Sequence, residues 1–440
     1  MRKYLSVLLI LVLVVTLAMV AAPALPLKAA TTWNVPGDAD NITDAIAMAS
    51  AGDTINVAPG AYNENVVVNK QLRIIGAGAG STTVTANVTS LSVFVVTPTG
   101  NSTTIKNFTI TGATTVPAIV LTGGGNTIDS NNITGNYNGI SIRSGENRII
   151  RNTIANNSNR GIHYNFTERS WNQVEYNDIY GNTNWGVYAE PMPGDSHWKH
   201  NTGFNYWGDV SGPSAFGPGT GDKVNEYVWF NPWLNTNQST ILSTGIANIS
   251  IAVRLKVGWN TLATPLPMAG DSNQWSEIVT NSSLTYDAAY TYDRDTGFSL
   301  LASGNATFYL DPLEAVVIKV SSPTWVTLKV STEVHPPGTR ELKQGWNLMG
   351  SAMAITEREL EMWKVLKSVN KTASGLTGYI TVISPPLASQ PSWVYVRGQE
   401  ETSGFEWEKM DFGRGYWIYM ENPDEMASFS STPITARIWE

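Results

Sequence analysis

NTIDSNNITGNYNGISI, residues 126–142, is the first of three consecutive stretches that decide the fold. NRIIRNTIANNSNRGIHY (147–164) and NQVEYNDIYGNTNWGVYA (172–189) follow it, and all three share the pattern N-x-[IV]-x-x-N-x-I-x-x-N. A unit of 21 to 25 residues with short alternating apolar pairs is too short for a pair of stacked helices. It fits one coil of a parallel β-helix, in which bends separate three short strands.

The shared positions predict which side chains stack between coils. Asn131, Asn152 and Asn177 occupy equal positions, and we expect Asn201 to continue their row. Asparagine tolerates the left-handed conformation of a tight bend, and its side-chain amide can pair with the asparagine of the next coil. The sequence therefore predicts structural asparagine ladders. The apolar residues of each unit should point inward, which in the first unit are Ile128, Ile133, Ile140 and Ile142.

Composition narrows the class of protein. Charged residues make up only 15% of the chain, a balance that suits an all-β extracellular protein better than a helical cytosolic one. The formal net charge of -8 argues against nucleic acid as a partner, because a phosphate-binding protein needs a basic face. The chain has no cysteine, which excludes disulfides and thiol-ligated metals.

The N-terminus has the features of a secretory signal peptide. Arg2 and Lys3 precede an apolar run over residues 4–22, and A-P-A at 22–24 supplies small residues for cleavage. We therefore assign residues 1–30 to a signal peptide and expect a secreted, extracellular or cell-surface protein. The run is about as long as a bilayer is thick, so an uncleaved membrane anchor stays open as the alternative. Contact with a membrane is expected only through this segment.

A short helix is predicted ahead of the first coils. Ile42, Ala45 and Ile46 lie on one face of an amphipathic segment, and Asn41 is placed to cap its N-terminus. Such a helix would cover the unpaired strand edges of the first coil.

The stretch AGDTINVAPGAYNENVVVNKQLRIIGAG, residues 51–78, resembles the opening of the pectin-lyase-like right-handed parallel β-helix superfamily, which includes pectin methylesterases. The asparagine-rich coils resemble the carbohydrate-binding and sugar-hydrolase repeats of that superfamily, including NosD-like periplasmic proteins. The resemblance covers residues 31–234 and implies a right-handed parallel β-helix with an N-terminal capping helix. FNYWGDVSGPS, residues 204–214, is similar to stretches that close the last coil of bacterial β-helices, so we expect Trp207 to cover the apolar end.

The second half of the chain contains a different, duplicated unit. LKVGWNTLATPL from Leu255 matches LKQGWNLMGSAM from Leu342, and a short helical segment follows each, around Trp275 and Trp363. We expect a linker at 235–250 and two small related β-rich domains at 251–332 and 333–440. The G-W-N and G-Y-W-I-Y strands resemble repeats found C-terminal to β-helices in prokaryotic cell-surface proteins. Their tryptophans are expected to fill small cores, with a carbohydrate-binding aromatic platform as the alternative.

Catalytic motifs of the β-helix superfamily are missing. The paired aspartate and arginine motifs of pectin methylesterases do not occur, nor do the motifs of polygalacturonases, alginate epimerases or pectate lyases. H-E-x-x-H, P-loop and G-x-S-x-G sequences are absent as well. His163, His197 and His200 share a region, but their spacing is not that of a metal triad. We expect no metal or cofactor; calcium stays open without a supporting motif.

The repeat register predicts what decorates the outside of the coils. Alternation in the G-[IV]-x-[IVYA] strand stacks two outward columns, Val120, Ser141, His163 and Tyr188 in one and Thr122, Arg143, Asn165 and Glu190 in the other. Our candidates for glycan binding are Arg143, His163, Trp185, Tyr188 and Glu190, because aromatic faces stack on sugar rings and arginine binds carboxylates. If the site is catalytic, His163 as base and Arg143 as charge neutraliser suit β-elimination from a uronate. The alternative is an ordinary solvated β face.

The sequence therefore predicts an all-β protein with a right-handed parallel β-helix, followed by two small related β-rich domains. Its predicted function is to bind or structurally organise polysaccharide at the cell surface without catalysis. A lyase or hydrolase acting on an acidic glycan is one alternative, and a purely structural envelope spacer is the other.

Overall fold

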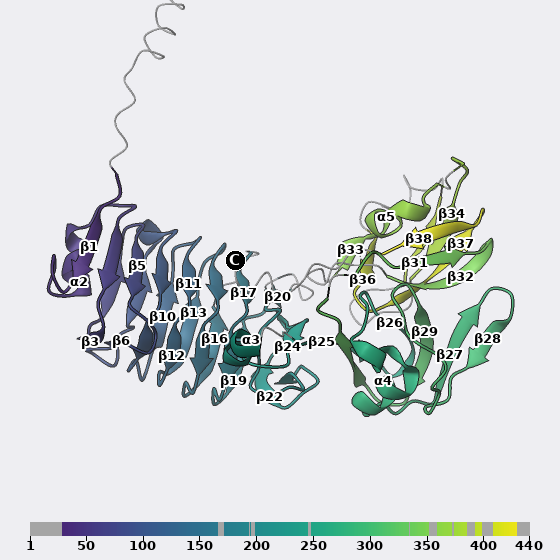
Figure 1. Cartoon of the computed structure of the whole chain (residues 1–440), viewed down its shortest axis with the longest axis horizontal. Helices are drawn as coiled ribbons and strands as arrows, with labels where there is room; N and C mark the ends of the chain where they lie inside the picture. Colours follow the sequence, from purple (N-terminus) through teal and green to yellow (C-terminus); the bar gives the residue numbers. More distant parts are fainter. Residues whose placement is uncertain are drawn as a thin grey trace, which may run out of the picture.

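The structure is a computed structural model that describes residues 29–165, 171–192, 194, 199–244, 248–333, 335–351, 359–371, 374–384, 392–397 and 408–428. The predicted signal peptide lies outside these residues except for its last two positions. Figure 1 shows a stack of coils formed by the first half of the chain and a second β-rich region formed by the second half.

Three parallel sheets run along the coil stack, and each coil contributes one strand to each sheet. The first coil sheet contains β1 (Thr32–Val35), β2 (Thr54–Val57), β5 (Arg73–Gly76), β8 (Thr104–Lys106), β11 (Thr127–Asp129), β14 (Arg148–Ile150) and β17 (Gln173–Glu175). The second contains β4 (Val66–Val68), β7 (Phe94–Val96), β10 (Pro117–Leu121), β13 (Asn138–Ile142), β16 (Arg160–Tyr164), β19 (Trp185–Ala189), β22 (Gly221–Val224) and β21 (Pro213–Ala215). The third contains β3 (Gly60–Asn63), β6 (Thr82–Thr85), β9 (Thr109–Thr111), β12 (Asn132–Thr134), β15 (Thr153–Ala155) and β18 (Asp178–Tyr180). The predicted parallel β-helix is confirmed.

Stacked isoleucines fill the coil core as the repeat predicts. Ile128 pairs with Ile105 on one side and Ile149 on the other, and all three are fully buried. Burying one such side chain contributes roughly 1.5–3 kcal/mol, so repetition in every coil supplies most of the cohesion of the stack.

Asparagine ladders connect the coils at the bends. Asn131 donates its backbone N–H and its side-chain amide to Asn152 Oδ1, at 2.9 and 3.1 Å. Asn152 donates in the same way to Asn177, and Asn177 donates to Asn205 Oδ1 at 2.8 and 2.9 Å. The ladder therefore continues at Asn205, and the prediction of Asn201 is wrong. The sequence separation widens from 25 residues to 28 in the last step, which the earlier periodicity does not contain.

A helix covers the first coil, where the sequence predicts one. Helix α2 (Ile42–Met48) begins after Asn41, whose side chain accepts a hydrogen bond from the Asp44 N–H. Its buried face, formed by Ile42, Ala45 and Ile46, packs on β1, β2 and β4. Lys70 Nζ donates to the Ile46 and Ala49 carbonyls at the other end, which holds the helix on the stack.

The stretch at 204–214 belongs to the last coil. Trp207 is fully buried within the coil core, and Asn205 completes the ladder described above. Gly212 has a φ of +89°, and a Cβ there would lie 2.8 Å from the Trp233 ring, so glycine is required. Two short pairs, β20 (His200–Asn201) with β23 (Val228–Trp229) and β24 (Trp233–Leu234) with β25 (Ile249–Leu255), complete this end.

The chain passes directly from the coil stack into the second region. Helix α3 (Gln238–Thr244) occupies part of the expected linker, and β24 pairs antiparallel with β25. The first module contains β25, β26 (Gly258–Ala263), η2 (Gly270–Asn273), α4 (Trp275–Asn281), β27 (Ala288–Asp293), β28 (Gly297–Leu300), β29 (Ala315–Val320) and β30 (Thr324–Val330). The second contains β31 (Thr339–Leu342), β32 (Gly345–Gly350), β33 (Glu359–Glu361), α5 (Met362–Val365), η3 (Lys367–Val369), β34 (Tyr379–Ile383), β35 (Val394–Val396), β36 (Lys409–Asp411), β37 (Gly415–Met420) and β38 (Asp424–Ala427). Buried side chains of both modules belong to one apolar core.

The G-W-N strands place asparagine inside and tryptophan outside. Asn260 Nδ2 donates to the Lys256 and Gly258 carbonyls, and Asn347 makes the equivalent bonds in the second module. Trp259 is 50% exposed as a result. The prediction that these tryptophans fill the cores is wrong for Trp259, for the partly exposed Trp346 and for the 47% exposed Trp363, and it is confirmed for Trp275.

Candidate functional site

The outward columns predicted on the coils are present in the second coil sheet. Val120 pairs with Ser141, Ser141 with His163, and His163 with Tyr188. The second column continues the same ladder, since Asn165 N–H donates to the Ile142 carbonyl and Glu190 N–H to the Tyr164 carbonyl. The predicted register is confirmed.

Side chains of the last two coils of this sheet form one contact group, which we call the coil cluster: Arg160, His163, Trp185, Tyr188 and Glu190. The Arg160 guanidinium carbon lies 4.2 Å from the centre of the Tyr188 ring. The Tyr188 ring in turn lies 5.4 Å from Trp185 and 5.7 Å from His163. The cluster therefore joins aromatic faces and a guanidinium within one patch, to which Trp185 and Tyr188 contribute partly exposed rings.

His163 is held from two sides. Its Nε2 lies 2.9 Å from Glu190 Oε1, and since an ionised carboxylate only accepts, Nε2 is the nitrogen that donates. Arg160 Nη1 lies 3.1 Å from Nδ1 and 3.2 Å from Nε2, nearly equal distances that place it over the ring face. The Nδ1 lone pair is thus oriented by the Glu190 contact and is not the in-plane acceptor of Arg160.

The charges around His163 keep it neutral at pH 7. Burial is the main cause that lowers the pKa of His163, and the neighbouring Arg160 and Arg143 charges lower it further. The hydrogen bond with Glu190 acts in the opposite direction without reversing the shift. Only 8% of the residue is exposed, so a ligand would meet mainly the side chains around it.

Arg143 lies beside this cluster and is exposed. Its Nε is 3.4 Å from Ser141 Oγ, and Ser141 is fully buried. The predicted candidates Arg143, His163, Trp185, Tyr188 and Glu190 therefore lie on one face of the stack, with Arg143 at its edge. Earlier coils carry Val67, Val95 and Val120 at the corresponding outward positions, so the polar face is confined to the later coils.

Arg160 is a member of the coil cluster that the sequence analysis missed. It pairs with Asn138 on one side and Trp185 on the other, one register step before the two predicted columns. The repeat alignment contained this signal, because R-G-I-H-Y and W-G-V-Y-A align with arginine opposite tryptophan.

The histidines do not form a metal site. Among the residues that the structure describes, no group of three or more His, Cys, Asp or Glu could hold a metal ion. His200 stacks on Tyr164 with ring centres 4.2 Å apart, and burial lowers its pKa to about 4. His197 lies outside the described residues. In the described part of the chain, no helix has the length and apolar character needed to cross a membrane.

Exposed aromatic side chains also gather on the outer faces of the modules. Trp259 lies 6.2 Å from Tyr290, and Tyr292 lies 4.9 Å from Trp417 of the second module. Phe298 contacts both Tyr292 and Trp417 and is 58% exposed. These rings are placed as the alternative prediction of an aromatic platform requires.

Three parallel sheets with one strand per coil define the first half of the chain as a right-handed parallel β-helix. A family model described as a right handed beta helix region matches residues 92–205, which include the asparagine-rich coils. Among solved structures, the chain is similar to pectin methylesterase PemA from Erwinia chrysanthemi, with 14% identity and a TM-score of 0.25. That similarity covers 42% of this chain and 59% of the other, so the chain spans less than two thirds of that structure. No curated protein matches the sequence.

Proposed function

We propose that the protein is exported and binds an acidic polysaccharide through the coil cluster and Arg143, with the β-helix as a rigid support. The observation that carries this proposal is the Arg160 guanidinium, which lies against the Tyr188 ring and over the His163 ring. Partly exposed aromatic rings beside guanidinium groups can stack on sugar rings and pair with carboxylates. The resemblance to NosD-like and carbohydrate-binding repeats supports the same class of ligand.

The position of the cluster on the stack suits a polymer. Its residues come from successive strands about 4.8 Å apart, so recognition groups are repeated along the axis of the stack. Arg143 and Arg160 supply two positive charges from neighbouring coils, whereas Glu190 is engaged with His163. A chain of uronate residues could therefore contact both arginines at once.

A panel of acidic and neutral polysaccharides tests the proposal by affinity electrophoresis of the exported protein. Arg160→Ala and Trp185→Ala should each weaken retention by an acidic polysaccharide by about tenfold, the loss of roughly one charged contact. Arg148→Ala is the matched control, because Arg148 is exposed on the first coil sheet and contacts only Gln173 among described side chains. Equal retention of all three variants would refute the coil cluster as the binding site.

The His163–Glu190 contact favours one second function, a polysaccharide lyase. A carboxylate that fixes an imidazole with its other nitrogen unprotonated is the arrangement of a general base. In β-elimination Nδ1 would take the C5 proton of a uronate, the C4–O bond would break, and solvent would protonate the leaving oxygen. Ultraviolet absorbance of the unsaturated product tests this directly, and His163→Ala should abolish it. Retention without absorbance would leave binding alone, and absence of both would favour a structural spacer.

A further inference from the structure

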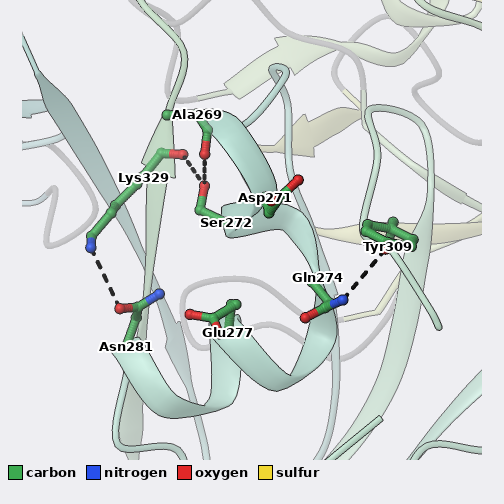
Figure 2. Close-up of a pocket in the computed structure, with 8 residues that line it drawn as sticks. All are labelled: Ala269, Asp271, Ser272, Gln274, Glu277, Asn281, Tyr309 and Lys329. Carbon is green, nitrogen blue, oxygen red and sulfur yellow. Dashed lines mark hydrogen bonds between the residues drawn. The ribbon is translucent and has the colours of Figure 1, made fainter. Parts of the chain in front are cut away.

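A cavity of ≈ 550 Å³ lies in the first module, away from the coil cluster. Figure 2 shows Lys329 and Asn281 on one side, Gln274 and Tyr309 on the other, and Glu277 between them. Helix α4, the preceding η2 turn, strand β30 and the segment after β28 supply these residues. The cavity is lined by Ala269, Asp271, Ser272, Gln274, Glu277, Asn281, Tyr309 and Lys329.

Part of the polar lining is fixed and part is available. Gln274 Nε2 donates to the Ala306 carbonyl at 2.8 Å and lies 3.4 Å from the Tyr309 hydroxyl. Lys329 Nζ lies 3.4 Å from Asn281 Oδ1, at the limit of a hydrogen bond. Within the described part of the chain, the carboxylates of Asp271 and Glu277 accept no hydrogen bond and form no ion pair.

The second module shows what this place becomes when it is closed. Trp275 N–H donates to the Phe308 carbonyl at 3.0 Å, and Met362 N–H donates to the Glu408 carbonyl at 3.0 Å. Met362 follows Trp346 at the separation at which Trp275 follows Trp259. Trp275 therefore corresponds to Met362, and the sequence alignment that matched it with Trp363 is wrong by one residue.

This correspondence aligns the lining of the cavity with charged residues of the second module. The bridge between Gln274 and Tyr309 corresponds to the pairing of Glu361 with Lys409. By the same offset, Glu277 corresponds to Lys364.

Ion pairs occupy the second module at these positions. Lys364 pairs with Glu361 at 2.8 Å, and Lys409 pairs with Glu359 at 2.6 Å. The second module thus satisfies its charges internally, and the first module leaves a phenol ring and two carboxylates facing solvent.

We propose that the cavity of the first module binds a sugar residue that carries no negative charge, either neutral or amino-substituted. The Tyr309 side chain is 43% exposed and offers a face for stacking on a pyranose ring. Asp271 and Glu277 accept hydrogen bonds from sugar hydroxyl or ammonium groups, and Lys329 and Asn281 donate. A uronate would meet both carboxylates, which opposes its binding. The proposal does not depend on the coil cluster, whose arginines suit the opposite charge.

Titration calorimetry of the full chain with glucose, glucosamine and galacturonate tetramers tests this site. We expect binding of the glucose or glucosamine tetramer, weakened about tenfold by Tyr309→Ala through the loss of one stacking contact. Glu277→Lys installs the residue of the second module and should weaken the glucosamine tetramer more than the glucose tetramer. Because Glu277 is exposed, this variant is expected to fold, which a thermal melt verifies.

Two matched variants separate this site from the rest of the molecule. Lys409→Ala, at the position that corresponds to Tyr309, should leave binding of both tetramers unchanged. Arg160→Ala should change binding only of galacturonate, so failure of the acidic-glycan proposal and failure of this one give different results. Absence of binding by both uncharged and amino tetramers, or binding that neither Tyr309→Ala nor Glu277→Lys weakens, overturns the proposal.

Discussion

The coil stack and the duplicated modules both depend on buried asparagines, and they use them over different distances along the chain. In the stack, Asn152 accepts from Asn131 in one coil and donates to Asn177 in another, so each residue joins three coils. In the modules, Asn260 bonds only to backbone groups within four residues, where it closes the turn before β26. The same side chain therefore provides long-range cohesion in one region and local turn geometry in the other.

This comparison has a consequence for how the two regions diverge. A ladder residue is constrained by its neighbours in the coils before and after it, whereas a turn residue leaves the surface around it unconstrained. The modules accordingly keep G-W-N in both copies and differ in the lining of the α4 cavity, where ion pairs replace an open polar surface.

The largest expected effect is in the ladder. Asn152→Ala should lower the free energy of unfolding by about 4 kcal/mol, because the donors of Asn131 and the Ile128 carbonyl lose their buried partner. Chemical denaturation followed by circular dichroism measures this change. Asn165→Ala, at an exposed position one coil edge away, should change it by less than about 0.5 kcal/mol. Similar losses from both variants would contradict a specific role for the ladder.

The next effect concerns Asp178, where the stack meets α3. Its carboxylate accepts from the Gln238 N–H at 3.0 and 3.2 Å, and burial raises its pKa to about 6 despite this bond. A raised pKa in the folded state means that stability is complete below about pH 4 and is lost as the pH rises through 6. Asp178→Asn should remove this loss, so its advantage over the natural protein should grow by about 3 kcal/mol between pH 4 and pH 8. A difference that does not vary with pH would exclude this linkage.

Loss of a turn asparagine should cost less than loss of a ladder asparagine. Asn260→Ala and Asn347→Ala should each destabilise the protein by about 1.5 kcal/mol, since each removes bonds to a few partly solvated backbone groups. Comparison of the two by the same denaturation measurement sharpens the contrast, because equivalent turns should give equal losses. A loss as large as that of Asn152→Ala would erase the distinction between the two regions.

The smallest effect is expected at the exposed tryptophan of the same turn. Trp259→Ala should change the free energy of unfolding by less than about 0.5 kcal/mol, because half of the side chain already faces solvent. Trp275→Ala, at the fully buried tryptophan of the same module, provides the reference and should cost about 4 kcal/mol.

The sequence allowed much of the coil stack to be predicted, because each coil repeats the environment of the one before. The pairing of Ser141 with His163 and of His163 with Tyr188 follows from that periodicity alone. Asn205 could not be predicted in place of Asn201, because the length of the last coil depends on how the chain closes the stack. Arg160 was missed because the alternation was followed only forward from the conserved glycine of the repeat unit.

The modules were harder to predict, for a physical reason. Tryptophan and asparagine next to each other give no sign of which one is buried, and hydrophobicity alone places the tryptophan inside. The Asn260 amide can close the turn only from the inner face, and Gly258, with a φ of +95°, lets the chain turn there. Two copies of this turn did not reveal that Trp275 corresponds to Met362, since that match rests on backbone bonds rather than on residue type.

The asparagine ladders also give the stack an electrical direction. Each amide donates toward the later coil and accepts from the earlier one, so the amide dipoles of a ladder point the same way and add along the axis, as peptide dipoles do in an α-helix. In the ladder through Asn157 and Asn182, the donating end meets the carboxylate of Asp222, with Asn182 Nδ2 2.8 Å from Oδ2. The stack is thus a polarised rod in which a buried acid faces the positive end of the array.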